Sequence, residues 1–311
     1  MNSSVVACAI VKNEASYLLE WVAYHRLIGV DHFLFYENDS SDETWSILQK
    51  LHRLGWATCI RWPSRPKVNN QKEAYKNAIK RTKNRFDWVA FIDLDEFIVL
   101  DGPGSLKGLL QKFDFADAVA INWKMFGSSG ATEKLPGLVM ERFRRCAVDA
   151  FYSNENVKSV VRPEKVKRVD SVHVFELFAG WENCYQCDGL PLEFGVGRRA
   201  KRVTYQGAQI NHYFTKSLAE WRVKRVRGKA NVPIGDPERV RDSRVFGRLD
   251  RNEAYDDRIQ PWCEPTRVEM ARLTALMADL PPEQSLVKRW KRAFRQCLPT
   301  AKNSSAAALE H

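Results

Sequence analysis

The sequence predicts an α/β fold with a doubly wound, mostly parallel sheet, and three observations lead to this prediction. Short apolar runs rich in β-branched residues alternate with amphipathic segments over the first hundred residues. Polar clusters follow three of these apolar runs. The 311 residues are 44% hydrophobic and 28% charged, an ordinary globular composition that can form a full core. No uncharged apolar run approaches 18 residues, so we expect no membrane-spanning helix.

The first half predicts strand–helix alternation. Strands are expected at 5–11, 32–38, 57–61 and 87–93, with helices after Ser16, around Trp45, Leu48 and Leu51, and over 70–82. Such alternation implies right-handed crossovers and hence a parallel sheet. The second half is less regular. Short strands are expected at 118–123, 159–162, 171–175 and 208–212, helices at 217–227, 266–280 and 285–297, and poorly patterned chain over 233–267.

Positive charge is concentrated in one stretch. The net charge is +11, and residues 198–248 contain fourteen Lys and Arg against four Asp and Glu, a surplus of ten. A local field of this size attracts an anion such as a phosphate, a nucleic acid, an acidic glycan or an anionic membrane. A solvated basic face is an equally good interpretation. No nucleic-acid-binding motif accompanies the charge, so nucleic acid is an unlikely partner.

The cysteines and the N-terminal sequence predict the cellular compartment. Seven scattered Cys residues and an N-terminus without the pattern of a secretory signal favour a reduced, cytoplasmic protein. Cys184 and Cys187 form a lone CxxC without a second ligand pair, so we interpret them as incidental thiols. The final AAALEH is typical of a vector scar, and residues 298–311 are treated as a tail.

The three polar clusters fall at the carboxyl ends of predicted strands, where open α/β sheets bind ligands. They are Lys12-Asn13-Glu14, Glu37-Asn38-Asp39 and Asp93-Leu94-Asp95. In extended backbone, Asp93 and Asp95 would point to the same side and could hold one Mg²⁺ or Mn²⁺ that bridges the phosphates of a nucleotide. The alternative is a solvated turn.

Longer segments resemble a known family. The runs ACAIVKNEASYLLEWVAYHRLIGVDHFLFYENDSSDETWSIL, QKEAYKNAI and DWVAFIDLDEFIVL, followed by WKMFGSSG, ERF, KSVVRPEKV, SVHVF and INHYFTKSLAEWRVKRVRG, are similar to GT-A nucleotide-sugar glycosyltransferases. More narrowly, they resemble the family-2-like group related to glycosyltransferase family 92, the domain of unknown function 23. The resemblance covers about residues 5–230. It implies a GT-A, Rossmann-like mixed sheet flanked by helices, with a C-terminal helical extension.

The resemblance also implies a division of the chain. Residues 1–230 would form the glycosyltransferase domain, with a nucleotide-binding half (1–100) and an acceptor half (101–230), and residues 231–297 the helical extension. A UDP-sugar donor is implied, with Lys12, Asn13, Glu14, Asp39, Gln71, Tyr75 and Asp93 around the nucleotide. Asp93, Asp95 and His212 would be the metal ligands. An imidazole beside carboxylates favours Mn²⁺ over Mg²⁺.

Further candidates are less specific. Lys158, Arg162, Lys216 and Arg222 are candidates to bind the diphosphate or an anionic acceptor, of which Lys158 and Lys216 are assigned to the donor. Trp123, Trp181 and His173 are candidates for the acceptor site. The resemblance implies an inverting transfer, which needs a general base, and Asp188 and Glu141 are the candidates. Each of these residues could instead be a core side chain or a surface charge.

The expected function is metal-dependent transfer of a hexose, galactose or glucose, from a UDP-sugar to a glycan or glycolipid in surface polysaccharide synthesis. The charge at 198–248 favours an anionic acceptor. The basic amphipathic segment 285–297 could lie on the inner face of the cell membrane or dock on the core. One alternative is a non-catalytic nucleotide- or polyanion-binding protein that uses the 198–248 face. A sugar nucleotidyltransferase is disfavoured, because Lys12-Asn13-Glu14 stands where its Gly-rich loop would be.

Overall fold

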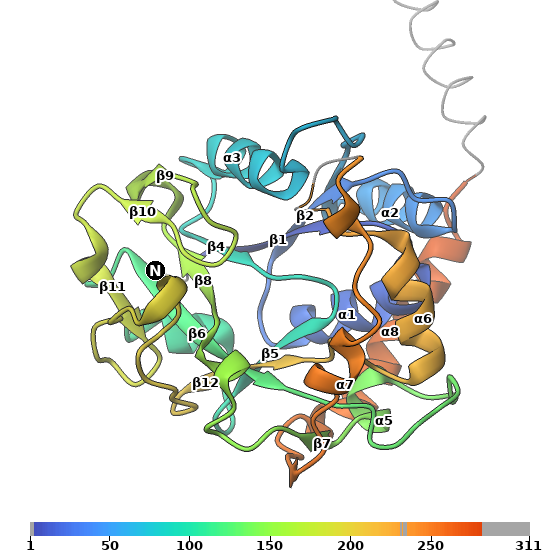
Figure 1. The fold of residues 1–311 in the computed structure, drawn as a ribbon. Helices are drawn as coiled ribbons and strands as arrows, with labels where there is room; N and C mark the ends of the chain where they lie inside the picture. Colours follow the sequence, from blue (N-terminus) through green and yellow to red (C-terminus); the bar gives the residue numbers. More distant parts are fainter. Residues whose placement is uncertain (1–2, 231, 233–234, 282–311) are drawn as a thin grey trace, which may run out of the picture.

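The computed structural model describes residues 3–230, 232 and 235–281, which form a mixed sheet with helices on both faces (Figure 1). The strands are β1 Val5–Val11, β2 His32–Glu37, β3 Ala57–Arg61, β4 Trp88–Phe91, β5 Glu96–Leu100, β6 Ala118–Met125, β7 Arg145–Cys146, β8 Val157–Val161, β9 Val166–Arg168, β10 Glu176–Leu177, β11 Cys184–Gln186, β12 Ala208–His212 and β13 Ala254–Tyr255. The α-helices are α1 Ala15–Leu27, α2 Thr44–Arg53, α3 Asn70–Thr82, α4 Leu106–Gln111, α5 Val139–Arg142, α6 Leu218–Arg227, α7 Val245–Leu249 and α8 Cys263–Ala278. Short 3₁₀ turns are η1 Tyr152–Glu155, η2 Pro163–Lys165, η3 Trp181–Asn183, η4 Val196–Arg198, η5 Pro237–Arg239 and η6 Gln260–Trp262.

The main sheet has a parallel half and a mixed half. Its strands run in the order β3-β2-β1-β4-β8-β6-β12-β5, and β11 pairs with β6. The first four are parallel, with Val6 of β1 opposite His32 of β2 and Val89 of β4. β8 is antiparallel to both β4 and β6, and β5 is antiparallel to β12. The parallel half therefore places the ends of β1, β2 and β4 at one edge.

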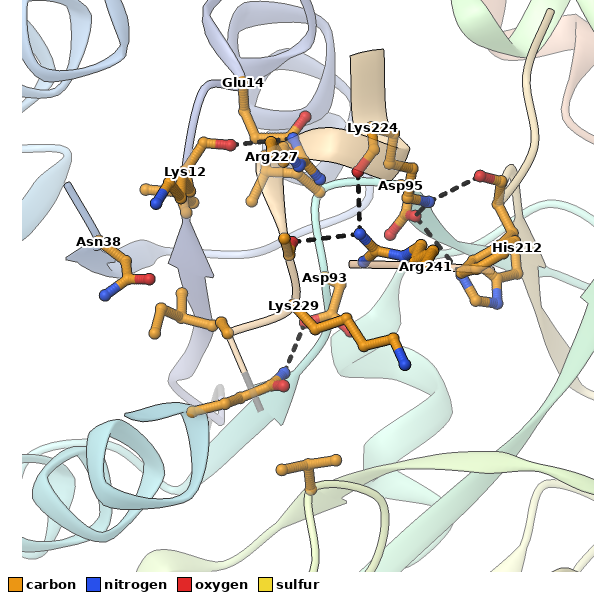
Figure 2. A pocket seen from close by; sticks show the side chains of 18 of the residues that line it. Lys12, Glu14, Asn38, Asp93, Asp95, His212, Lys224, Arg227, Lys229 and Arg241 are labelled. Carbon is orange, nitrogen blue, oxygen red and sulfur yellow. Dashed lines mark hydrogen bonds and ion pairs between the residues drawn. The ribbon is translucent and has the colours of Figure 1, made fainter. Parts of the chain in front are cut away.

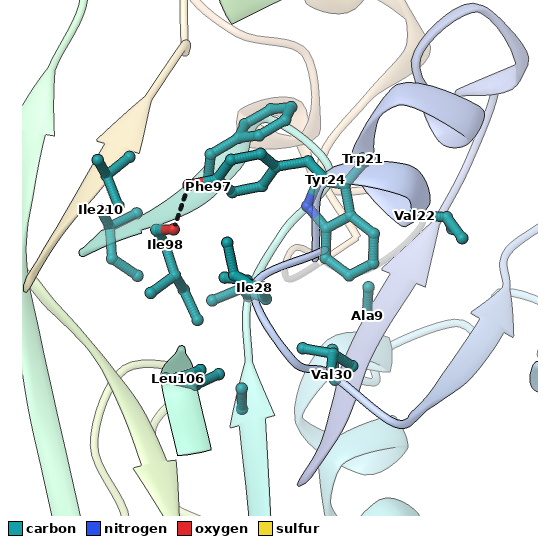
Figure 3. Packing of buried hydrophobic residues seen from close by; sticks show 14 of the residues in the cluster. Ala9, Trp21, Val22, Tyr24, Ile28, Val30, Phe97, Ile98, Leu106 and Ile210 are labelled. Atoms are coloured by element: carbon teal, nitrogen blue, oxygen red, sulfur yellow. Dashed lines mark hydrogen bonds between the residues drawn. The ribbon is translucent and has the colours of Figure 1, made fainter. Parts of the chain in front are cut away.

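The alternation of side chains along β1 builds a core on each face of the sheet. Val5, Ala7 and Ala9 point into the cluster that contains α1, whereas Val6 and Cys8 point into the cluster beneath α3. In the first cluster, α1 packs against β5, and the hydroxyl of Tyr24 donates to the backbone oxygen of Ile98 at 2.7 Å (Figure 3). The continuous burial of β1 explains why its sequence is apolar throughout.

The expected elements of the first half are confirmed with small shifts at their ends. The helix expected after Ser16 begins earlier, at Ala15, whose backbone N–H donates to Asp42, at 3.1 Å, on the neighbouring loop. The predicted strand 87–93 ends at Phe91. In the second half, the strand expected at 171–175 is absent from the structure, since only Glu176–Leu177 form a short strand there.

The described part of the predicted C-terminal extension packs against the first half. α8 lies beside α1 (Figure 1), and Arg26 of α1 forms an ion pair with Glu269 of α8 at 3.2 Å. The predicted helix 285–297, with its membrane contact, and the tail 298–311 lie outside the described residues. No helix within the described ranges has the length and hydrophobicity needed to cross a bilayer.

Candidate functional site

A pocket of about 350 Å³ opens at the carboxyl ends of β1, β2 and β4, where the fold class predicts a ligand site. We call it the main pocket. Its polar lining consists of Lys12, Glu14, Asn38, Gln71, Asp93, Asp95, Lys158, His173, His212, Lys224, Arg227, Lys229 and Arg241, joined by Trp123 and Phe214. Lys12 and Asn38 lie on one side of it, and Asp95, His212 and Lys224 on the other (Figure 2).

The two aspartates of the DxD sequence lie in a turn rather than on a strand. β4 ends at Phe91 and β5 begins at Glu96, so the extended geometry that would align Asp93 with Asp95 is absent. The indole N–H of Trp21 donates to the backbone oxygens of Asp93 at 3.1 Å and of Glu96 at 2.9 Å. The buried Trp21 indole therefore holds the backbone of this turn in place.

Asp93 is directed towards α3 and β8. Its carboxylate accepts from the amide of Gln71 at 2.9 Å and from the ammonium of Lys158 at 2.8 Å, and the hydroxyl of Tyr75 lies 3.5 Å away. Burial would lower the pKa of Lys158, but Asp93 and Glu96 hold it well above its ordinary value. Three predicted donor-site residues thus converge on Asp93, although Tyr75 is fully buried and touches the site through its hydroxyl alone.

Asp95 is directed towards β12 and α6. It is ion-paired with the ammonium of Lys224, and its Oδ2 atom lies 3.6 Å from Nε2 of His212. Burial alone would raise the pKa of Asp95, but Lys224 and His212 hold it well below its ordinary value. Burial also lowers the pKa of His212, so its imidazole is neutral and its ring nitrogen is available as a ligand.

The three predicted metal ligands are not assembled as expected. Across the described ranges, no set of three or more His, Cys, Asp or Glu side chains is arranged to hold a metal ion, because Asp93 is turned to Lys158. Asp95 and His212 do face each other, and Oε1 of Glu96 lies 3.9 Å from the same His212 nitrogen. That oxygen is buried and has no hydrogen-bond partner among the described residues. Asp95 and His212 thus offer two protein donors, and a cation held by them would take its remaining ligands from a phosphate.

Helix α6 closes one side of the main pocket. Arg227 pairs with Glu14 at 2.5 Å and donates to the backbone oxygen of Lys12 at 2.9 Å, so the end of α6 is tied to the end of β1. Arg241 follows and donates to the backbone oxygens of Lys224, at 2.9 Å, and of Gly228, at 3.1 Å (Figure 2). Six Lys or Arg against three Asp or Glu line the pocket, which leaves it with a surplus of positive charge.

Of the residues that follow β2, the predicted Asp39 does not line the main pocket, whereas its neighbour Asn38 does. Asp39 is exposed, has a φ of 55°, and accepts from the backbone N–H of Ser64 at 2.8 Å, so it shapes the loop and does not line the pocket. Its neighbour Asn38 lines the pocket instead, and its amide donates to the backbone oxygen of Trp62 at 2.8 Å. Asn13 also lies outside the main pocket, where its side-chain oxygen accepts from the backbone N–H of Ser41.

The predicted acceptor residues divide into two groups. Trp123 and His173 both line the main pocket, with ring centroids 5.2 Å apart, and Trp123 also contacts His212 at 4.3 Å. Trp181 is elsewhere, since it packs edge-on against Phe194 at 5.1 Å. Trp181 has polar neighbours in the sequence, as is common in loops. These neighbours alone do not show whether the ring binds a ligand or anchors the loop.

Both candidate bases lie outside the main pocket. Asp188 is ion-paired with Arg202 and accepts from the backbone N–H of Leu190 at 3.1 Å. Glu141 accepts from the backbone N–H of Leu138 at the start of α5 and pairs with Arg267. Each carboxylate therefore has a local structural role, and neither lines the pocket.

Other predicted residues are also placed elsewhere. Arg162 donates to the backbone oxygen of Ala116 at 3.0 Å, Arg222 is exposed on α6, and Lys216 lines a separate hollow. Cys184 is buried with no disulfide, and burial raises the pKa of its thiol to about 12, as expected of an incidental thiol.

The sequence reasoning missed four cations of the main pocket, which are Lys224, Arg227, Lys229 and Arg241. A signal for the first two was present, because residues three apart on a helix share a face and α6 was predicted with its basic character. Their partners Asp95 and Glu14 are 129 and 213 positions away, so the pairing itself left no local pattern.

Comparisons with known proteins find curated relatives of one family. The chain is 29% identical over 183 residues to a glycosyltransferase family 92 protein of Oryza sativa subsp. japonica, which covers 57% of this chain and 30% of that protein. It is likewise 29% identical over 189 residues to a family 92 protein of Ricinus communis, covering 56% of this chain and 32% of the relative. The chain thus spans about a third of the length of these curated relatives.

Solved structures give partial likenesses. TarS of S. aureus (residues 1–349) is 13% identical with a TM-score of 0.34, covering 51% of this chain and 47% of TarS. Glucosyl-3-phosphoglycerate synthase from Mycobacterium tuberculosis, in complex with Mn²⁺, UDP-glucose and glycerol 3-phosphate, is 16% identical with a TM-score of 0.31, covering 53% and 58%. A model of glycosyltransferase family 92 matches residues 3–237, three quarters of the sequence, and the chain belongs to this family.

Proposed function

We propose that this protein transfers a hexose, galactose or glucose, from a UDP-sugar to a glycan or glycolipid acceptor, with the donor bound in the main pocket. One observation carries the proposal. The pocket lies at the carboxyl ends of the parallel strands and combines a surplus of cations with a turn of two carboxylates. Membership of glycosyltransferase family 92 supports the reaction class.

The cations are suited to a diphosphate. Lys158, Lys224 and Arg227 are each paired with a carboxylate, whereas Lys229 and Lys12 have no ion-pair partner among the described residues. Charge-assisted hydrogen bonds from such groups are stronger than those between neutral groups, particularly where water is excluded. A diphosphate would therefore bind between Lys12 and Arg227 on one side and Lys224 on the other (Figure 2).

The remaining lining divides between nucleoside and sugar. Asn38 and Gln71 offer amide groups for a base or ribose, and Asp93 has the most exposed carboxylate of the turn, with 32% of its side chain accessible against 9% for Asp95. We assign to Asp93 a contact with a hydroxyl group of the donor. The indole of Trp123, which packs edge-on against His173, offers one aromatic face for a sugar ring.

A divalent ion completes the proposed site. Asp95 and His212 would hold Mn²⁺, or Mg²⁺, together with oxygens of the donor diphosphate, and the mixed oxygen and nitrogen donors favour Mn²⁺. When bound, the ion neutralises the charge that develops on the departing diphosphate. Lys224 must leave Asp95 before the ion can bind there. We therefore expect the ion to bind only together with the donor diphosphate.

The alternative of a polyanion-binding face is less well supported. Lys224, Arg227, Lys229 and Arg241 all belong to the basic stretch 198–248, and all line the main pocket rather than an open surface. Cations that converge on a pocket favour a small anionic ligand over an extended polymer.

The test combines donor binding with a single substitution. Melting temperatures would be measured with UDP, UDP-galactose and UDP-glucose in the presence of Mn²⁺, Mg²⁺ or EDTA, since a ligand of the native state raises stability by mass action. We expect stabilisation by UDP with Mn²⁺, and loss of both this effect and sugar transfer, by about 100-fold, in Asp95→Asn. Asp114→Asn, on the surface and paired with Arg162, is the control. Absence of any nucleotide effect in the wild type would contradict the proposal and favour the polyanion-binding alternative.

A further inference from the structure

A second hollow lies beside the main pocket, on the other side of the Glu14–Arg227 ion pair. We call it the side pocket. It has a volume of about 390 Å³ and shares Glu14, Lys224 and Arg227 with the main pocket. Its own lining includes Tyr17, Lys134 and Lys216. A group bound in the side pocket would therefore be separated from the donor by one wall of side chains.

The side pocket contains a buried ammonium without an anionic partner. Lys216 is only 5% exposed, and its Nζ atom lies 4.3 Å from the centroid of the Tyr17 ring. Among the described residues, no carboxylate or backbone oxygen bonds to this ammonium. Burial of an unpaired charge is costly, because the charge loses its hydration without a compensating bond. The arrangement is stabilised if an anion enters the side pocket.

A second lysine strengthens the positive field. The Nζ atom of Lys134 lies 5.2 Å from the same Tyr17 ring, and Lys134 also has no ion-pair partner among the described residues. Both ammonium groups thus face one aromatic side chain, from two segments that are 82 positions apart in the sequence.

The carboxylates that line the side pocket already have other ion-pair or hydrogen-bond partners. Glu14 pairs with Arg227, and Glu220 accepts from Arg142 at 2.8 Å. Asp42 accepts from the backbone N–H groups of Ala15 and Thr44, at 3.1 and 3.0 Å. None of these carboxylates bonds to either lysine, and with four Lys or Arg against three Asp or Glu the side pocket retains a surplus of one positive charge.

We propose that the side pocket binds the anionic group, a phosphate or a carboxylate, of the acceptor. The proposal rests on the proposed function, since it assumes that the main pocket holds the donor. Lys216 contributes the buried charge, Lys134 the exposed one, and the ring of Tyr17 holds both ammonium groups towards the ligand. The site thereby selects acidic sugars over neutral ones. Lys216, assigned to the donor from the sequence, is thus an acceptor residue.

The test uses the full chain and three probes that differ in charge. Calorimetry would measure the binding of glucose 6-phosphate, glucuronate and glucose in the presence of UDP and Mn²⁺. We expect the two acidic sugars to bind at least 10-fold more tightly than glucose, and the comparison between them to show whether phosphate or carboxylate is preferred. Equal affinity for all three sugars in the wild type would overturn the proposal.

Two variants test whether Lys216 and Lys134 cause the preference for acidic sugars. Lys216 has a φ of 52°, a conformation that Asn adopts more readily than most residues, so Lys216→Asn removes the ammonium without added backbone strain. This variant should lose the 10-fold preference, and Lys134→Gln should reduce it, while UDP binding stays unchanged in both. Lys50→Gln, exposed on α2, is the matched control. If Lys216→Asn does not fold, the exposed Lys134→Gln still decides the question. Retention of the full preference in these variants would overturn the proposal, whereas loss of UDP binding by the wild type would contradict the donor site instead.

Discussion

The ammonium of Lys224 on α6 is ion-paired with the carboxylate of Asp95 inside the wall of the main pocket, although 129 positions separate the two residues. Both side chains are more than nine-tenths buried. The pair ties the last helix of the family-matched region to the turn between β4 and β5. It also places a protein cation on the carboxylate that we propose as a metal ligand.

We therefore expect Lys224 and a divalent ion to compete for Asp95. In Lys224→Met, Asp95 loses its partner, and breaking a buried pair in this way costs about 3–5 kcal/mol. Mn²⁺ without nucleotide should then raise the melting temperature of the variant, whereas the wild type should need UDP as well. Differential scanning fluorimetry with and without Mn²⁺ checks this. Lys229→Met, which removes an ammonium of the same pocket that is not paired with Asp95, is the control. An equal response of the wild type and Lys224→Met to Mn²⁺ alone would rule out the competition.

Trp21 is expected to position the carboxylate turn. Trp21→Phe keeps the aromatic packing and removes two hydrogen bonds, to the backbone oxygens of Asp93 and Glu96. The loss should cost about 1–3 kcal/mol of stability and lower the rate of sugar transfer about 10-fold, with a larger effect on kcat than on the KM for the donor. Tyr24→Phe, which removes a hydrogen bond to Ile98 from the same helix, should cost stability alone. Equal kinetic effects of the two substitutions would argue against a positioning role.

Much of the parallel half could be predicted from sequence, because β1, β2 and β4 are largely buried on both sides and α2 and α3 each carry an apolar stripe. β1, β3 and α3 were predicted at their observed bounds, as was β12 in the mixed half. The end of β4 could not be predicted. The apolar run continues through Ile92 into the turn, and the bonds from Trp21 that end the strand come from a residue 72 positions earlier.

The residues of the main pocket were predicted only in part. Lys12 and Asp93 were found because strand ends meet at one edge of a parallel sheet, whereas Gln71 and His212 were implied by the family resemblance. Long-range pairing decided the rest. From the sequence, Asp188 could be the general base, a surface carboxylate or a partner of a nearby arginine, and the structure pairs it with Arg202. Pairing of this kind depends on tertiary contacts, which leave no periodic signal in the sequence.

Asp188→Asn and Glu141→Gln should each leave the rate of sugar transfer within about threefold of wild type. Neither carboxylate lines the main pocket, and each is paired with an arginine, Arg202 and Arg267 respectively. The partly exposed Glu141 pair contributes about 0–1 kcal/mol, whereas loss of the charge of Asp188, whose side chain is 7% exposed, should cost about 1–3 kcal/mol, so both variants should still fold. Steady-state rates at saturating donor test this directly. A 100-fold loss in either variant, with an unchanged melting temperature, would reinstate that carboxylate as the base.

Glu20 gives the protein a pH-dependent stability near neutrality. It is buried on α1 and accepts from the backbone N–H groups of Val139, at 2.9 Å, and Met140, at 3.1 Å, at the start of α5. Burial raises the pKa of its carboxyl to about 7, against the lowering effect of these two bonds. The segment before α5 carries Lys134, so Glu20 also supports one wall of the side pocket.

The sign of the effect follows from proton binding. Between pH 4.5 and about 7 the folded state holds the Glu20 proton and the unfolded state has released it, so the free energy of unfolding falls as the pH rises. The contribution is fully present below pH 4.5 and is lost above about pH 7, a change of about 3 kcal/mol. Glu20→Gln cannot titrate and keeps one of the two hydrogen bonds.

The measurement is urea unfolding of the wild type and Glu20→Gln at pH 5, 6, 7 and 8. All other titrating groups are common to the two proteins, so the difference between their free energies of unfolding isolates Glu20. The wild type should be the more stable at pH 5, and its advantage should shrink by about 2–3 kcal/mol by pH 8. A difference that stays constant over this range would show that Glu20 is already ionised in the folded protein at pH 5, with its charge stabilised by the start of α5.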